Sequence, residues 1–160
     1  FYRTTFYSFC SQILFSWFTW NIERSYPQGR TDLEFVGKYH ERFAGLRWVI
    51  EFKYLSNAEF SKVKCSIEKI TLKEEDSNQI LGYAHGIREE YPHAKVRLFI
   101  IYCIGNTGFK IYELWNLKTM DMLIYEVLVI NPYPDRYDER KDHIINLIIG
   151  VWFFSISIWA

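Results

Sequence analysis

The sequence predicts an α/β fold in which helices flank a mixed β-sheet. Residues 2–17 and 76–91 place apolar side chains at helical spacing, whereas 30–36 and 47–54 alternate apolar and polar residues like half-buried strands. A continuous apolar run at 95–104 is typical of a central strand that is buried on both faces. The expected order is one helix, three strands, one helix and two strands.

The first expected elements are a helix over 2–17 and a strand over 18–25. The helix is predicted from apolar residues that recur every three or four positions: Tyr2, Phe6, Phe9, Ile13 and Trp17. Residues 18–25 alternate apolar and polar side chains, which predicts the first strand. Because the chain begins at Phe1 instead of a methionine, we expect it to be a piece of a longer protein.

The second and third strands carry charged residues at defined positions. In RWVIEFKY (47–54) the even-numbered residues share one face, and Glu51 and Lys53 share the other. In GRTDLEF (29–35) the side chains of Asp32 and Leu33 lie on opposite faces of the strand. A short connecting segment would let the two strands pair antiparallel, which could bring Asp32 opposite Glu51.

This charged set predicts a functional site. The Glu51 and Lys53 backbones lie about 6.6 Å apart on a strand, and a charged pair on so apolar a strand is costly to bury unless it is matched. Two carboxylates and a backbone carbonyl make the kind of oxygen site that Mg²⁺ prefers. A lysine beside such an ion can orient or deprotonate a water molecule.

The rest of the expected domain follows the third strand. Residues 57–73 are mixed and charged and predict a helical or irregular excursion. Asp76 or Ser77 is a plausible N-cap for the helix over 76–91, whose apolar stripe is Ile80, Tyr83, Ala84 and Ile87. The turn sequence GNTG precedes a hairpin partner strand at 109–115.

Composition limits the function classes. The 160 residues are 49% hydrophobic with a formal net charge of zero, so nucleic-acid binding would need a local basic patch. Three isolated cysteines, Cys10, Cys65 and Cys103, form neither a disulfide framework nor a zinc motif, and they predict a reducing, cytoplasmic location. No glycine-rich phosphate loop is present, so we expect no ATPase activity in this piece.

Asp32 followed by Glu51-Phe52-Lys53 resembles the PD-(D/E)XK nuclease superfamily, which has the restriction-endonuclease-like fold. The ordered set GRTDLEF, VIEFKY and QILGYA (79–84) is similar to the nuclease-like domain found C-terminal to AAA-ATPase-like modules in bacterial proteins. The resemblance covers residues 1–117, and three motifs in order are more specific than one D…ExK match.

The resemblance implies a Mg²⁺ ion, or Mn²⁺, held by Asp32, Glu51 and the Phe52 carbonyl, with Lys53 steering or activating a water. It also implies that Gln79 and Tyr83, which share a helix face, lie beside the site. Alternatively, Tyr83 is a core residue and Gln79 caps a turn. Members of the superfamily often carry a further acidic residue near the first helix or strand, and Glu23 is the candidate; it could equally be an exposed residue or a partner for Arg30.

Candidate contacts to nucleic acid lie among the basic residues near the site. Arg30 could bind a phosphate or anchor Asp32 or Glu23. The candidates for backbone contacts also include Lys38, Lys62 and Lys64. Nearby glutamates offset these lysines, so each could also belong to a solvated charged face.

The C-terminal part departs from this pattern. We expect residues 118–142 to be a polar linker or extension and 143–160 to be an apolar tail. The uncharged stretch 144–160 would extend about 26 Å as a helix, short of the roughly 30 Å of a bilayer core. It could be a membrane anchor, an apolar element packed on the domain or a partner, or a sequence end foreign to the domain; we favour a non-membrane role.

The expected function is metal-dependent hydrolysis of phosphodiester bonds in nucleic acid, with DNA as the substrate, and a homodimer could form on duplex. The main alternative is a non-catalytic recognition module that serves an upstream ATPase. A third hypothesis is a membrane-tethered interaction protein in which the tail matters most.

Overall fold

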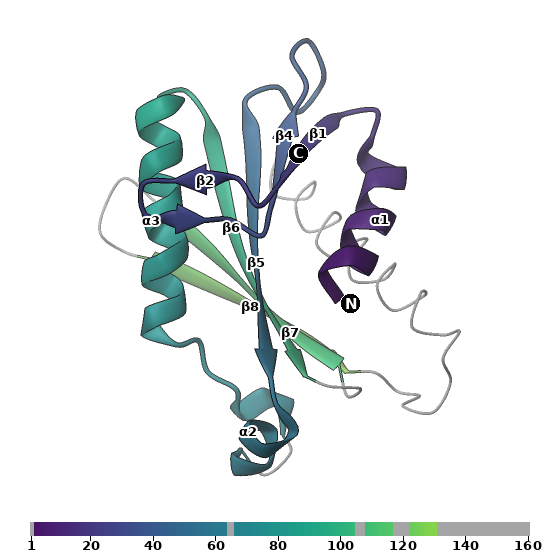
Figure 1. The fold of residues 1–160 in the computed structure, drawn as a ribbon, viewed down its shortest axis with the longest axis vertical. Coiled ribbons are helices and arrows are strands. Elements are labelled where there is room, and N and C mark those ends of the chain that lie inside the picture. Colours follow the sequence, from purple (N-terminus) through teal and green to yellow (C-terminus); the bar gives the residue numbers. More distant parts are fainter. Residues whose placement is uncertain (1, 64–65, 105–107, 117–121, 131–160) are drawn as a thin grey trace.

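The computed structural model describes residues 2–63, 66–104, 108–116 and 122–130, and it has the mixed α/β architecture that the sequence predicts (Figure 1). Within these ranges a six-stranded sheet lies between α3 on one face and α1 on the other. The elements are α1 (Tyr2–Leu14), β1 (Phe18–Ile22), β2 (Ser25–Tyr26), β3 (Gly29–Arg30), β4 (Leu33–Gly37), β5 (Leu46–Leu55), α2 (Asn57–Lys62), the 3-10 helix η1 (Ile67–Lys69), α3 (Glu74–Glu90), β6 (Lys95–Ile104), β7 (Gly108–Asn116) and β8 (Met122–Ile130).

The sheet combines antiparallel and parallel pairing. Its order is β1-β4-β5-β6-β7-β8, and β5 and β6 run parallel while the other described neighbours run antiparallel. A parallel pair needs a long crossover, and the segment that contains α3 provides it. β4 pairs with β5 with Leu33 opposite Ile50. This register brings Asp32, just before β4, next to Glu51, as the alternating patterns predict.

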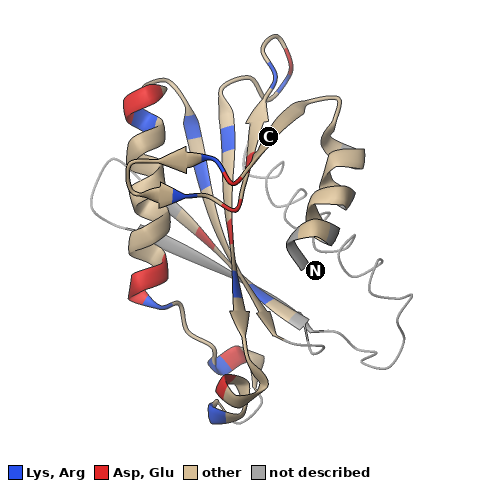
Figure 2. Ribbon diagram, in the orientation of Figure 1, with Lys and Arg blue, Asp and Glu red and all other residues tan. Residues whose placement is uncertain are grey.

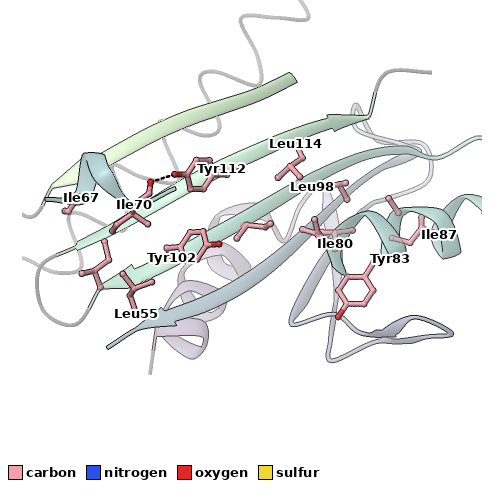
Figure 3. Close-up of a cluster of buried hydrophobic side chains, with 14 of the residues drawn as sticks. Leu55, Ile67, Ile70, Ile80, Tyr83, Ile87, Leu98, Tyr102, Tyr112 and Leu114 are labelled. Carbon is pink, nitrogen blue, oxygen red and sulfur yellow. Dashed lines mark hydrogen bonds between the residues drawn. The ribbon is translucent and has the colours of Figure 1, made fainter. Parts of the chain in front are cut away.

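The face of the sheet under α3 holds one hydrophobic core (Figure 3). The predicted stripe of α3 is buried there: Ile80, Tyr83, Ala84 and Ile87. These side chains face residues of the sheet that include Leu98, Tyr102 and Tyr112. The hydroxyl of Tyr112 donates to the backbone oxygen of Ile70 at 2.5 Å, which ties the segment before α3 to the sheet.

The opposite face packs against α1. Cys10 and Leu14 of α1 are buried, and Phe6 and Tyr7 pack against the same cluster. The sheet contributes the remaining buried members: Phe18, Leu33, Phe35, Trp48, Ile50, Phe99, Ile101, Cys103, Phe109 and Ile111. Trp48 and Ile50 therefore lie on the α1 side and Val49 on the α3 side, which confirms the predicted alternation of β5.

A small hairpin of β2 and β3 departs from the sequence prediction, which assigned 18–25 and 30–36 to two continuous strands. Glu23 adopts a positive φ of 53°, and the chain turns away from β1 there. The hairpin lies against α3, where Gly29 (φ 139°) would place an added Cβ 3.3 Å from the Tyr83 ring. Two-residue strands are too short to produce a readable alternation, so periodicity did not reveal them.

The segment between β5 and α3 confirms the predicted excursion and corrects the start of the helix. α2 begins with a capping box in which Ser56 and Glu59 bond each other's backbone N–H groups. α3 begins at Glu74 with Lys73 as the N-cap. Asp76 was therefore wrongly predicted as an N-cap, like its neighbour Ser77: both lie inside the first turn and are buried.

The sheet continues beyond the expected boundary at residue 117. β8 pairs antiparallel with β7 and falls within 118–142, where a polar linker or extension was expected. Residues 131–160, with the apolar tail, lie outside the described residues, so the division at 143 stays a prediction. Of the helices that are described, none has the length and apolar character needed to cross a membrane.

Candidate active site

Asp32 joins the start of β4 to the middle of β5. The last pair between these strands is Leu33 opposite Ile50. Beyond it, the Phe52 backbone N–H donates to Asp32 Oδ2 at 2.8 Å, and the Asp32 N–H donates to Glu51 Oε2 at 3.4 Å. The Asp32 carboxylate thus lies against the edge of β5 where strand pairing ends.

The Phe52 carbonyl shares that edge. A residue's N–H and C=O point toward the same neighbouring strand, because opposed residues in an antiparallel ladder exchange both bonds. Since the Phe52 N–H points to Asp32, its carbonyl faces the same side. The Phe52 ring lies on the α1 face of the sheet, where it makes an edge contact with Phe6 of α1, at 5.3 Å between ring centroids.

Glu51 is 5% exposed and faces α3. Its Oε1 accepts a hydrogen bond of 2.9 Å from Gln79 Nε2. The pKa of Glu51 is raised, first because burial disfavours the carboxylate and second because the Asp32 carboxylate lies nearby; Lys53 opposes both effects. Negative charge is therefore concentrated where a cation would relieve it.

Lys53 places its ammonium among three acceptors. Its Nζ lies 2.6 Å from Gln79 Oε1, 3.3 Å from Asp76 Oδ1 and 3.4 Å from Glu51 Oε1. Burial by itself would lower the pKa of Lys53, but the Glu51 and Asp76 carboxylates outweigh burial and raise it. Lys53 is therefore held as an ammonium beside the acidic pair.

Gln79 and Tyr83 of α3 extend the network to the hairpin. The Gln79 amide donates to both Glu51 and the Tyr83 hydroxyl, at 2.9 and 2.6 Å. The Tyr83 hydroxyl donates in turn to the backbone oxygen of Arg30 at 3.0 Å, while its ring is buried in the core (Figure 3). Tyr83 therefore packs in the core and also bonds Gln79, and its role in a site stays a prediction.

Asp76, which the sequence pattern predicts as a helix cap, is a neighbour of the site. It is 7% exposed, lies 3.3 Å from the Lys53 ammonium and accepts a hydrogen bond from the Tyr102 hydroxyl. One signal in the sequence could have revealed it: Asp76 precedes Gln79 by three residues, so the two share a helix face.

Glu23 and Arg30 pair with each other at the hairpin, at 3.4 Å between Glu23 Oε2 and Arg30 Nη1. Among the described residues, no group of three or more His, Cys, Asp or Glu side chains could hold a metal ion. Glu23 therefore does not complete a carboxylate triad with Asp32 and Glu51. The positive φ of Glu23 belongs to the turn into the hairpin, and the alternative prediction, a partner for Arg30, describes its position.

The predicted basic contacts are spread over the molecule (Figure 2). Arg30 is close to the site and its side chain is 61% exposed. Lys38 lies beyond the far end of β4 from Asp32, about 20 Å away by strand rise, and its ammonium bonds the Phe15 backbone oxygen. Lys38 is therefore not beside the acidic pair; Lys62 is exposed on α2, and Lys64 lies outside the described residues.

The donor set suits a small divalent cation. Asp32 and Glu51 supply two carboxylates, and the Phe52 carbonyl faces the same strand edge. Mg²⁺ binds proteins through one or two carboxylates and retains several waters, so a set of two carboxylates and one carbonyl fits it. Nitrogen or sulfur ligands are not part of this set, and soft metals would find it unfavourable.

Comparison with known proteins agrees with this geometry. The family model described as the PD-(D/E)XK nuclease superfamily matches residues 1–113, from α1 into β7. Searches of curated proteins and of solved structures gave no match. The matched segment contains the whole network from Asp32 to Tyr83. The chain belongs to the PD-(D/E)XK nuclease superfamily.

Proposed function

We propose that this domain is a Mg²⁺-dependent nuclease that hydrolyses phosphodiester bonds in DNA. One observation carries the proposal: the Glu51 carboxylate touches both the Asp32 backbone and the Lys53 ammonium, at 3.4 Å in each case. An acidic pair can supply oxygen ligands to a cation, and an adjoining ammonium can orient a water beside a phosphate. Membership of a nuclease superfamily supports the same reaction class.

Asp32, Glu51 and the Phe52 carbonyl would hold Mg²⁺, and Mn²⁺ suits the same ligands. When bound, the ion would polarise the phosphate and lower the pKa of a coordinated water. The protein preorganises these groups: the Phe52 N–H fixes one Asp32 oxygen, and Gln79 fixes one Glu51 oxygen. The ligands would therefore need little rearrangement before binding.

Lys53 would orient the attacking water and stabilise negative charge on the phosphate oxygens as the bond breaks. Its ammonium has three protons and three acceptors within 3.4 Å, so its direction is defined. Gln79 contacts both Lys53 and Glu51, and in the proposed reaction it holds each of these side chains in one rotamer. It could also donate to a phosphate once substrate displaces one of these bonds.

Nucleic acid would approach along the hairpin. Arg30 is exposed there and could bind a phosphate, whereas Lys62 on α2 would contact the backbone further away. Lys64 stays a predicted contact from the sequence. Tyr83, which bonds the Arg30 carbonyl, would act by placing Arg30. DNA as the substrate, a homodimer, an upstream AAA-ATPase-like module, a bacterial source and a cytoplasmic location stay predictions.

The test is a cleavage assay with plasmid, single-stranded DNA and RNA in Mg²⁺ or Mn²⁺. Lys53→Ala is run in parallel, with Glu75→Gln as a matched control because Glu75 is an exposed charged residue of α3. Metal-dependent cutting by wild type and control, lost in Lys53→Ala, supports a nuclease and names its substrate. Binding without cutting on every substrate would favour a recognition module instead.

A further inference from the structure

Asp76 is a buried carboxylate that the proposed reaction does not yet use. It lies in the first turn of α3, where its neighbours Glu74 and Glu75 are exposed. Its two oxygens have partners on different strands: Lys53 of β5 lies 3.3 Å from Oδ1, and the Tyr102 hydroxyl of β6 donates to Oδ2. Burying a carboxylate is costly without such partners, so this position requires an explanation.

We infer that Asp76 is a positioning residue for the proposed nuclease and holds the Lys53 ammonium in its working place beside Glu51. The inference rests on the proposed function and deepens it, because it names a residue that acts through Lys53. Asp76 meets the Lys53 ammonium and the Tyr102 hydroxyl, and Lys53 in turn meets the proposed ligand Glu51.

The three acceptors around Lys53 are not equivalent. Glu51 would share its charge with a bound cation, and the Gln79 oxygen is neutral. Asp76 is the charged partner that remains available to Lys53 when Glu51 binds metal. A lysine side chain is long and has many rotamers, so a fixed charged partner limits how far its ammonium can move.

Tyr102 in turn fixes Asp76. Its side chain is 1% exposed, and its hydroxyl accepts a hydrogen bond of 3.1 Å from the Lys73 backbone N–H while it donates to Asp76. The Tyr102 ring faces the α3 side of the sheet and packs edge-on against Tyr112, at 5.9 Å between centroids (Figure 3). The Tyr102 hydroxyl thereby links the N-cap of α3 to Asp76, and the Asp76 carboxylate links Tyr102 to Lys53.

The first test is steady-state cleavage by Asp76→Asn, with Glu75→Gln as the control for loss of charge in the same helical turn. We expect kcat to fall about 10- to 100-fold with KM within about twofold, because a displaced reactive group costs rate more than substrate binding. Mg²⁺-induced thermal stabilisation should persist in both variants. A wild-type kcat in Asp76→Asn would overturn the inference, whereas a wild type that does not cleave would overturn the proposed function.

Tyr102→Phe provides a second route, since it keeps the packed ring and removes the hydroxyl from Asp76. We expect a smaller fall in kcat, and the double variant with Asp76→Asn should be no slower than Asp76→Asn alone. Additive losses would show that Tyr102 does not act through Asp76. If Asp76→Asn fails to fold, an unchanged kcat in Tyr102→Phe would overturn the inference by itself.

A third measurement does not depend on cleavage. Limited acetylation of the folded protein with acetic anhydride, read by mass spectrometry, compares Lys53 with the exposed Lys62. In Asp76→Asn the released Lys53 side chain, which reacts as its neutral amine, should be acetylated several-fold faster relative to Lys62, and Glu75→Gln should match wild type. An unchanged ratio in Asp76→Asn would overturn the inference whether or not the protein cuts DNA.

Discussion

The backbone N–H of Phe52 donates a 2.8 Å hydrogen bond to Oδ2 of Asp32, just past the point where β4 stops pairing with β5. The Asp32 carboxylate thus accepts the hydrogen bond that the backbone carbonyl of a further β4 residue would otherwise accept from Phe52. Asp32 therefore has two roles, one in ending a strand pair and one beside the Phe52 carbonyl. Substitutions that remove one role at a time can separate them.

Asp32→Asn should keep the fold and lose the metal. In EDTA its free energy of unfolding should stay near that of wild type, because the amide oxygen still accepts from Phe52; Asp32→Ala should lose about 1 kcal/mol with that bond. Both variants should lose cleavage and any rise in stability with Mg²⁺. Urea denaturation with and without Mg²⁺ measures this, and continued stabilisation of Asp32→Asn by Mg²⁺ would contradict it.

Glu51 should make stability without metal depend on pH. Its raised pKa means that the folded state binds this proton more tightly than the unfolded chain. Protonated Glu51 therefore stabilises the folded state fully below the ordinary glutamate pKa of about 4.3. This stabilisation is lost as the pH rises through the higher pKa that Glu51 has in the folded state.

Glu51→Gln imitates the protonated form at every pH. In EDTA, its stability advantage over wild type should therefore grow between acidic and neutral pH. Denaturation curves across this range test the sign, with Glu75→Gln as the exposed control. If wild type gained stability relative to Glu51→Gln as the pH rises, the raised pKa of Glu51 would be contradicted.

Gln79→Glu should damage the site more than Gln79→Ala. The amide donates to Glu51 and Tyr83, and a carboxylate would remove these donors and add negative charge beside Glu51. We expect a loss of about 1–3 kcal/mol in stability for Gln79→Glu and a loss of cleavage in both variants. Asn78→Asp, which adds the same charge at the exposed neighbouring position, should behave like wild type in thermal unfolding and cleavage.

Glu34 should be essential for docking of the hairpin. It is fully buried, accepts from Arg47 at 2.6 Å and accepts from the Tyr26 hydroxyl of β2 at 3.0 Å. Glu34→Gln leaves the buried Arg47 without its counter-charge, and a loss of about 3 kcal/mol follows.

Hydrogen exchange should show faster opening of β2 and β3 in Glu34→Gln, alongside the lower stability in urea. Arg24 lies 3.6 Å from Glu34 and 2.7 Å from the exposed Glu90 of α3. Glu90→Gln should change little, because exposed ion pairs are screened by water. Equal effects of the two substitutions would mean that burial of Glu34 does not matter.

Local patterns predicted the faces of the strands correctly. Trp48 and Ile50 lie on the α1 side and Glu51 on the α3 side, as the period of two requires. Asp32 lies beside Glu51 because antiparallel pairing of the two strands follows from a short connection. The roles of these residues in catalysis stay predictions.

Other positions depended on contacts that no local pattern contains. Asp76 fits a helix cap by its position before the apolar stripe, whereas its partner Tyr102 comes 26 residues later in the chain. Glu23 was considered as a metal ligand, but a positive φ and the unforeseen hairpin bring it to Arg30. Lys38 follows the end of β4 that lies away from Asp32, and its ammonium bonds the Phe15 backbone oxygen.

The chain alone is enough to predict the α/β class, the order of the main elements, the acidic pair with its lysine, and the family. These properties depend on residue type and short-range periodicity, which a chain carries whether or not it is folded. The side chains that surround Lys53 could not be predicted in this way, because Gln79 and Asp76 come from a helix more than twenty positions away. Their positions depend on how α3 packs on the sheet, and that packing is a property of the whole buried core.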